Sequence, residues 1–198
     1  MTDLPERLER LFRPVDDWGE FRKGARPAAV VFVLYRQADR WMVPFVRRRG
    51  DLRDHPGQVA LPGGGVQPGE SAWQAAEREV AEEIGVPTGS LVPIGAGDQI
   101  YAAVSNFAVV PFVAYLPEPV PSFVHDSREL EGVLAIPLDR LLDDSAWLES
   151  KDAWRFRYLA HEESVVWGLT ERIVYGLTPK LKRGLAEDRS PDLPAAQG

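Results

Sequence analysis

Three glutamates near the end of one predicted helix are the residues whose spacing best supports chemistry. At 100° per residue, Glu79 and Glu83 lie about 40° apart on a helix, and Glu82 lies about 60° from Glu79. Like charges at this spacing repel, and the C-terminal end of a helix dipole disfavours anions. A hard divalent cation would resolve the conflict, because Mg²⁺ prefers carboxylate oxygens and retains waters for a phosphate substrate.

A solvated acidic surface is the alternative, and three glutamates alone would favour it because such helix faces are common. Four flanking residues favour a site instead. Gly64 begins a loop, and Glu70 follows after five residues. Arg78 comes seven residues later and can pair with Glu70, which would lock the loop onto the helix. Gly85 then ends the helix.

The run from Gly64 to Val86 resembles the box of the Nudix hydrolases. That box has a Gly, five residues, Glu, seven residues, Arg-Glu, a hydrophobic residue, any residue, Glu-Glu, any residue, Gly and a hydrophobic residue. Every position is met here, by Gly64, Glu70, Arg78, Glu79, Val80, Glu82, Glu83, Gly85 and Val86. The resemblance implies an α/β fold, namely the Nudix-type α/β/α sandwich with a mixed β-sheet and a loop-helix-loop catalytic motif.

The same resemblance implies roles for the box residues. Glu79 and Glu83 are the principal metal ligands, and Glu82 joins them or holds a metal-bound water. Glu70 is the partner of Arg78 rather than a ligand. The implied cofactor is Mg²⁺ or Mn²⁺, which would neutralise the pyrophosphate of a small nucleoside substrate, orient the attacking water and lower its pKa.

Glu129 is a fourth candidate catalytic residue. It lies where Nudix proteins often carry an acidic residue ahead of a short strand, and it could be a further metal ligand or a general base. A plain surface glutamate is an equal alternative, and Glu131 is an adjacent competitor. His55 could contact phosphate or hold its own loop by a backbone hydrogen bond.

Four arginines lie just before the box, in a chain of net charge −7: Arg47, Arg48, Arg49 and Arg53. Guanidinium forks suit phosphate oxygens, although charge clusters are usually solvated surface. The surrounding stretch resembles the signature of the coenzyme A pyrophosphatase branch of the Nudix family, with Arg48, Arg53, Gly57, Pro62, Gly63 and Gly64 in register. We therefore expect a substrate-binding set of Arg48, Arg53, Gly63 and Gly64.

This branch resemblance supplies the leading functional hypothesis, the hydrolysis of coenzyme A or its thioesters to 3′,5′-ADP and 4′-phosphopantetheine products. Arg49 and Leu61 depart from the branch pattern, and these departures concern fine substrate specificity rather than metal chemistry. The alternative substrate is another nucleoside diphosphate derivative, such as ADP-ribose, NADH or a dinucleoside polyphosphate. A non-catalytic, ligand-sensing Nudix domain ranks lower, because such domains often lose a box glutamate and this chain retains them all.

The composition fits a globular enzyme with a small-molecule substrate. A chain of 198 residues, 44% of them hydrophobic, suits one domain with a real core. The net charge of −7 argues against nucleic-acid binding, and the absence of cysteine excludes thiolate sites. The longest apolar run, residues 28–35, is too short to span a bilayer, so we expect a cytoplasmic protein with no membrane partner. The sequence does not specify an oligomeric state.

Hydrophobic periodicity predicts the elements that position these residues. Strands are expected at 27–35, 40–46, 91–95, 107–115, 132–136 and 154–159, with Pro44 indicating an edge or a bulge. Helices are expected near the N-terminus (Leu4 to Phe12) and at 71–84, 137–142 and 165–177, with Pro137 at the first position of the third.

Two further expectations concern the best-specified helix and the domain boundaries. Ser71 and Gln74 form a capping-box pattern, and the small residues Ala72, Ala75 and Ala76 would leave room for a ligand. We divide the chain into an N-terminal helical extension (1–26), a Nudix hydrolase domain (27–183) and a disordered tail (184–198).

Overall fold

The structure is a computed structural model, and it describes residues 3–51, 57–151 and 155–186. The helices are α1 Leu4–Glu9, α2 Ala72–Ile84, α3 Leu138–Leu142, the 3-10 turn η1 Asp144–Ala146 and α4 Leu169–Ala186. The strands are β1 Arg26–Gln37, β2 Arg40–Arg48, β3 Val59–Ala60, β4 Gly63–Gly65, β5 Val92–Ala96, β6 Ile100–Ala102, β7 Phe107–Leu116, β8 Leu130–Pro137, β9 Trp147–Glu149, β10 Arg157–His161 and β11 Ser164–Trp167. No helix in these ranges is both long and apolar enough to cross a membrane.

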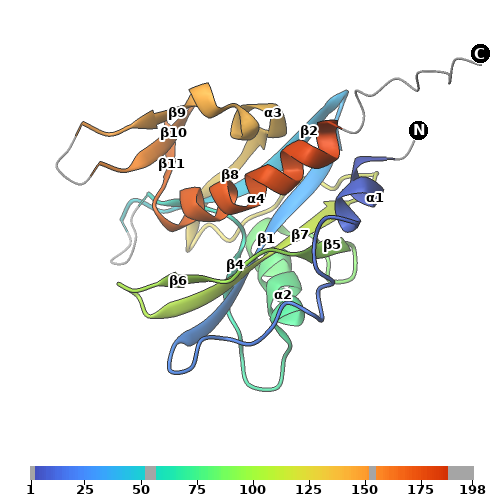
Figure 1. The fold of residues 1–198 in the computed structure, drawn as a ribbon. Coiled ribbons are helices and arrows are strands. Elements are labelled where there is room, and N and C mark those ends of the chain that lie inside the picture. The colour runs from blue at the N-terminus through green and yellow to red at the C-terminus, as the bar shows by residue number, and fades with distance from the viewer. Residues whose placement is uncertain (1–2, 52–56, 152–154, 187–198) are drawn as a thin grey trace, which may run out of the picture.

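An eight-stranded mixed sheet forms the centre of the molecule (Figure 1). β1 runs parallel to β7 along ten paired positions and antiparallel to β2 and β4. β5 and β6 pair with β7, and β8 pairs with β2. Strands β1 and β7 are almost continuously apolar because both of their faces are covered, which is the usual reason for such runs in a parallel pair.

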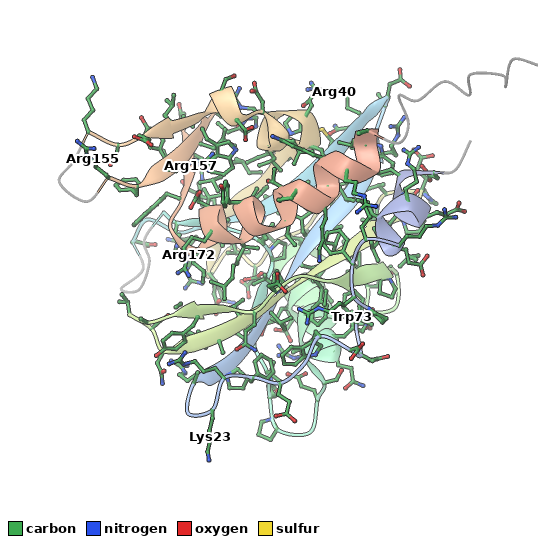
Figure 2. The ribbon with its side chains drawn as sticks, in the orientation of Figure 1. Lys23, Arg40, Trp73, Arg155, Arg157 and Arg172 are labelled. Atoms are coloured by element: carbon green, nitrogen blue, oxygen red, sulfur yellow. The ribbon has the colours of Figure 1, made fainter. Side chains whose placement is uncertain are left out.

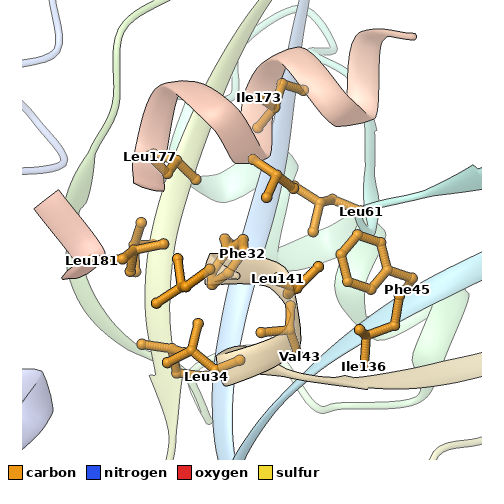
Figure 3. Close-up of a cluster of buried hydrophobic side chains, with 14 of the residues drawn as sticks. Phe32, Leu34, Val43, Phe45, Leu61, Ile136, Leu141, Ile173, Leu177 and Leu181 are labelled. Carbon is orange, nitrogen blue, oxygen red and sulfur yellow. The ribbon is translucent and has the colours of Figure 1, made fainter. Parts of the chain in front are cut away.

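Alternate residues of β1 enter two separate cores, one on each face of the sheet. Phe32 and Leu34 join the cluster beneath α4 and α1, which is seen in Figure 3. Val31, Val33 and Tyr35 join the cluster beneath α2. Helices α2 and α4 therefore cover opposite faces (Figure 1), and the predicted α/β/α sandwich with a mixed sheet is confirmed.

The C-terminal region differs from the prediction. Residues 165–167, expected to start the last helix, form β11 in a three-stranded sheet with β10 and β9. The helix starts after Gly168, whose φ of 67° suits glycine, and it continues to Ala186. Residues 184–186 are thus helical rather than part of a disordered tail, because α4 buries Leu181 and Gly184 against α1. The remaining tail, 187–198, lies outside the described residues.

Two prolines take positions other than those predicted. β2 is not an edge strand, since β1, β3 and β8 all pair with it. Pro44 lies between Met42, where the pairing of β2 with β1 ends, and Val46, where its pairing with β3 begins. Neither β1 nor β3 pairs with Pro44, so its missing N–H interrupts no hydrogen bond to these two strands. Pro137 is the N-cap of α3 rather than its first helical residue.

The N-terminal segment contains less helix than expected. Only Leu4–Glu9 is helical, and Leu4 and Leu8 are buried against α4. The chain then crosses the sheet edge, where Arg13 forms a bridge with Ala96. β1 begins at Arg26, within the segment predicted as the extension.

Candidate active site

Two glycines bring the loop of the box close to α2. Gly63 has a φ of 151°, and a Cβ there would lie 2.3 Å from the carbonyl oxygen of Ala29. A Cβ on Gly64 would lie 2.5 Å from Oε1 of Glu79. Gly63 therefore requires glycine, both for its backbone conformation and for its close approach to β1, whereas a side chain at Gly64 would displace the Glu79 carboxylate. The loop-helix-loop motif is thus packed around the Glu79 carboxylate.

Local sequence sets the two ends of α2. Ser71 and Gln74 form the predicted capping box, with Gln74 N donating to Ser71 Oγ at 3.2 Å and Ser71 N donating to Gln74 Oε1 at 2.8 Å. Gly85 ends the helix in the left-handed conformation with a φ of 74°. The expectation for the alanines is wrong: Ala72, Ala75 and Ala76 are buried, so they permit close packing of α2 on the core rather than space for a ligand.

Arg78 connects the loop to the helix. Its Nη2 donates to Glu70 Oε1 at 2.9 Å and to the Gly65 carbonyl at 3.0 Å, and its Nε donates to Glu70 Oε2 at 3.2 Å. Its Nη1 donates to Glu79 Oε1 at 2.8 Å and to Glu82 Oε2 at 3.3 Å. The expected contact with Glu70 is present, and these bonds lower the pKa of Glu70. Arg78 therefore organises three carboxylates at once.

Glu83 is the most perturbed acid of the site. Burial raises its pKa from 4.5 to about 7, while a hydrogen bond from Gly63 N at 2.9 Å opposes the shift. The charges of Glu79 and Glu129 raise the pKa further, and that of Arg48 lowers it. A carboxylate held in such surroundings is destabilised unless a cation joins it.

The predicted acids line one cleft of about 350 Å³. Glu79, Glu82 and Glu83 reach it from α2, and Glu129 reaches it from the segment before β8. Asp126, Arg128 and Leu130 complete the lining. Glu131, the competitor of Glu129, instead forms an ion pair with Arg47 at 3.2 Å and lines the neighbouring hollow. Sequence reasoning did not single out Asp126 and Arg128, and adjacency to Glu129 was the only signal for them.

The donor set of this cleft fits a hard divalent cation. All four of its predicted acids supply carboxylate oxygens, and Mg²⁺ or Mn²⁺ accepts such ligands together with water. Within the described ranges, no three acidic or histidine side chains are already arranged around one point as ligands. Arg78 explains part of this, because it occupies Glu79 Oε1 and Glu82 Oε2. Gly63 N donates to Oε2 of Glu83, so Oε1 of Glu83 takes no part in that bond and can face a cation.

The arginines before the box separate in space. Arg47 turns to Glu131 and to Ser164 Oγ, and Arg49 donates to Asp51 and to the Ser127 carbonyl. Arg48 makes none of these contacts. Its positive charge instead acts on Glu83 and lowers the pKa of that carboxyl. Its Nε is buried without a hydrogen-bond partner among the described residues. Arg53 and His55 lie outside the described residues.

Comparisons with known proteins agree with this geometry. A family model for the NUDIX domain matches residues 24–164. The chain is 31% identical to the Nudix hydrolase NudL of Yersinia enterocolitica, over 86% of this chain and 89% of that protein. It is 33% identical to Nudix hydrolase 3 of Caenorhabditis elegans, over 66% of this chain and 55% of that protein.

Solved structures support the same fold. A Caenorhabditis elegans Ap4A hydrolase complex superposes with a TM-score of 0.52 at 18% identity, over 81% of this chain and 96% of that chain. A MutT protein from Methanosarcina mazei gives a TM-score of 0.51 at 20% identity, over 86% and 100%. The sandwich and its box helix define a Nudix fold, and the family match is specific. The chain belongs to the Nudix hydrolase family.

Proposed function

We propose that this protein hydrolyses the pyrophosphate bond of coenzyme A or acyl-CoA, with Mg²⁺ or Mn²⁺ as cofactor. Water adds across the P–O–P bridge, and the products are 3′,5′-ADP and (acyl-)4′-phosphopantetheine. The observation that supports hydrolysis most directly is the single cleft lined by Glu79, Glu82, Glu83 and Glu129. The substrate assignment rests on the sequence pattern around Arg48.

The residues of the cleft divide the chemistry among them. Glu79, Glu82 and Glu83 would hold the cation, which supplies charge neutralisation of the diphosphate and a bound water of lowered pKa. Glu129 comes from a different segment of the chain and is available to accept a proton from the attacking water. Arg78 and Glu70 keep the box loop in place around Glu79.

The place of Arg48 favours a second candidate as well. The charge of Arg48 acts on Glu83, although Arg48 does not line the cleft. We therefore expect its guanidinium to contact the scissile pyrophosphate, which coenzyme A shares with ADP-ribose, NADH and dinucleoside polyphosphates. Recognition of the 3′-phosphate, the group specific to coenzyme A, would then fall to Arg53. The broader activity on nucleoside diphosphate derivatives is therefore the alternative to the coenzyme A assignment.

A product analysis separates the two candidates. Coenzyme A, dephospho-coenzyme A, ADP-ribose, NADH and diadenosine polyphosphates would each be incubated with and without Mg²⁺, and the products separated by chromatography. Metal-dependent release of 3′,5′-ADP, with the highest kcat/KM for coenzyme A, supports the proposal. A higher kcat/KM for another substrate supports the alternative, and no turnover of any of them would identify a ligand-sensing domain.

Arg48→Ala then tests which phosphate this arginine contacts. Loss of one charge-assisted fork contact should lower kcat/KM about 10- to 100-fold. If Arg48 reads the 3′-phosphate, the loss should appear with coenzyme A and much less with dephospho-coenzyme A. An equal loss with both substrates would assign Arg48 to the pyrophosphate they share.

A further inference from the structure

The cleft has a second wall that carries a positive charge. The wall facing α2 comes from residues 126–130, and Arg128 is the only cation among the described residues that line the cleft. We propose that Arg128 is a substrate-binding residue that binds a phosphate of the substrate from the side opposite the glutamates proposed to hold the metal. This inference rests on the proposed hydrolysis of a nucleoside diphosphate derivative, and it adds a specificity residue to that site.

Asp126 holds Arg128 in a geometry suited to this role. Arg128 Nε donates to both carboxylate oxygens of Asp126, at 3.0 and 3.1 Å, and Nη2 donates to Oδ2 at 2.6 Å. The Arg128 backbone N–H donates to Asp126 Oδ1 at 2.9 Å, so one carboxylate fixes both main chain and side chain. Within the described residues Nη1 makes no hydrogen bond. One edge of the guanidinium is thus tethered, and the opposite edge remains available for a second anion.

The turn that carries this pair is itself fixed. The carbonyl oxygen of Asp126 accepts hydrogen bonds from Glu129 N at 3.1 Å and from Leu130 N at 2.9 Å. Leu130 is buried and begins β8, so the turn is anchored to the central sheet. Arg128 and Glu129 are therefore displayed side by side at the cleft, one as a cation and one as a carboxylate.

The many carboxylates in the cleft explain why a positively charged side chain is useful there. Five carboxylates line it, from Glu79, Glu82, Glu83, Asp126 and Glu129. A diphosphate entering this space would meet repulsion, which a cation held by the glutamates of α2 would relieve on one side only. Arg128 would relieve it on the other side with hydrogen bonds of the kind that guanidinium groups form with phosphate oxygens.

A surface ion pair without function is the competing explanation, and the chain contains a pair for comparison. Arg40, labelled in Figure 2, pairs with Asp139 through two 3.0 Å bonds from Nη2. Its side chain is also exposed, at 59% against 87% for Arg128. Arg40 begins β2, at the opposite end of the strand from Arg48 and the cleft, and it lines none of the acidic wall. Arg40→Ala is therefore the matched control.

The test measures binding of ADP in the presence of Mn²⁺ by titration calorimetry, with Mn²⁺ alone as a second titrant. Arg128→Ala should weaken ADP binding about 10- to 100-fold and leave Mn²⁺ binding unchanged. Arg128→Lys should recover part of the loss, because the charge remains but the fork does not. Arg40→Ala should match the wild type in both titrations.

Two results would overturn the inference. One is ADP binding in Arg128→Ala within twofold of that in Arg40→Ala. The other is an equal loss of Mn²⁺ binding, because Arg128 would then act through the metal site. Both differ from failure of the proposed function, which would be a wild-type protein that hydrolyses no nucleoside diphosphate derivative with metal present.

Discussion

Glu83→Gln should stabilise the metal-free protein while abolishing most of its activity. The folded-state pKa of Glu83 is raised to about 7, mainly by burial, against an ordinary value of 4.5. A carboxyl whose pKa is raised on folding destabilises the folded state wherever it is ionised. This cost is absent below about pH 4.5, grows as the pH rises towards 7 and is complete above 7. Glutamine removes the charge and keeps an oxygen that can accept the bond from Gly63 N.

The magnitude follows from the shift. A difference of about 2.5 pKa units at 1.36 kcal/mol each gives about 3 kcal/mol at pH 8. At pH 5 most of the folded molecules carry a neutral Glu83, and the same linkage relation leaves less than about 1 kcal/mol. Glu83→Gln should therefore exceed the wild type in free energy of unfolding by about 3 kcal/mol at pH 8 and by little at pH 5.

Chemical denaturation in EDTA at both pH values measures this difference. Glu82→Gln is the control, because the Glu82 side chain is 60% exposed and its single ion pair lies on the surface, so its effect should stay below about 1 kcal/mol. With Mg²⁺ present, Glu83→Gln and Glu79→Gln should each lower kcat by orders of magnitude. A Glu83→Gln protein no more stable than the wild type at pH 8 would refute the argument from burial, and near-normal turnover in both variants would refute the metal assignment.

Three further substitutions probe the rest of the site. Arg78→Ala should lower the Tm by about 5 °C or more together with activity, because it leaves the partly buried carboxylates of Glu70 and Glu79 unpaired; an unchanged Tm with low activity would instead place Arg78 on the substrate. Gly64→Ala should weaken Mn²⁺ binding and lower kcat at least about tenfold, since the new Cβ displaces the Glu79 carboxylate; unaltered Mn²⁺ affinity would contradict this. Glu129→Gln should lower kcat about 10²- to 10⁴-fold with Mn²⁺ affinity retained, as a general base requires, whereas weakened Mn²⁺ binding would make Glu129 a ligand.

The parts of the fold that sequence reasoning predicted well depend on local rules. Helix α2 begins at a capping box and ends at a glycine, so its limits follow from adjacent residues. β11 was misassigned because Val165 to Trp167 is a short apolar run, and such a run has no helix or strand period of its own. Its partner decided the outcome: Leu159 of β10 pairs with Val166, which buries that side chain in the α4 core. β4 is composed of three glycines and carries no strand signal at all.

The same distinction separates the two halves of the site. The box glutamates share a face because a helix converts spacing into direction, and the cleft gathers them as expected. The arginines before the box are equally close in sequence, but a strand directs neighbours to opposite sides, and Arg47 and Arg49 find partners away from the cleft. Arg128 reaches the cleft from an irregular segment, where no period relates position to direction. Its place depends on the bond to Asp126 and on the anchoring of Leu130 in the sheet, and both of these follow from the tertiary structure rather than from spacing.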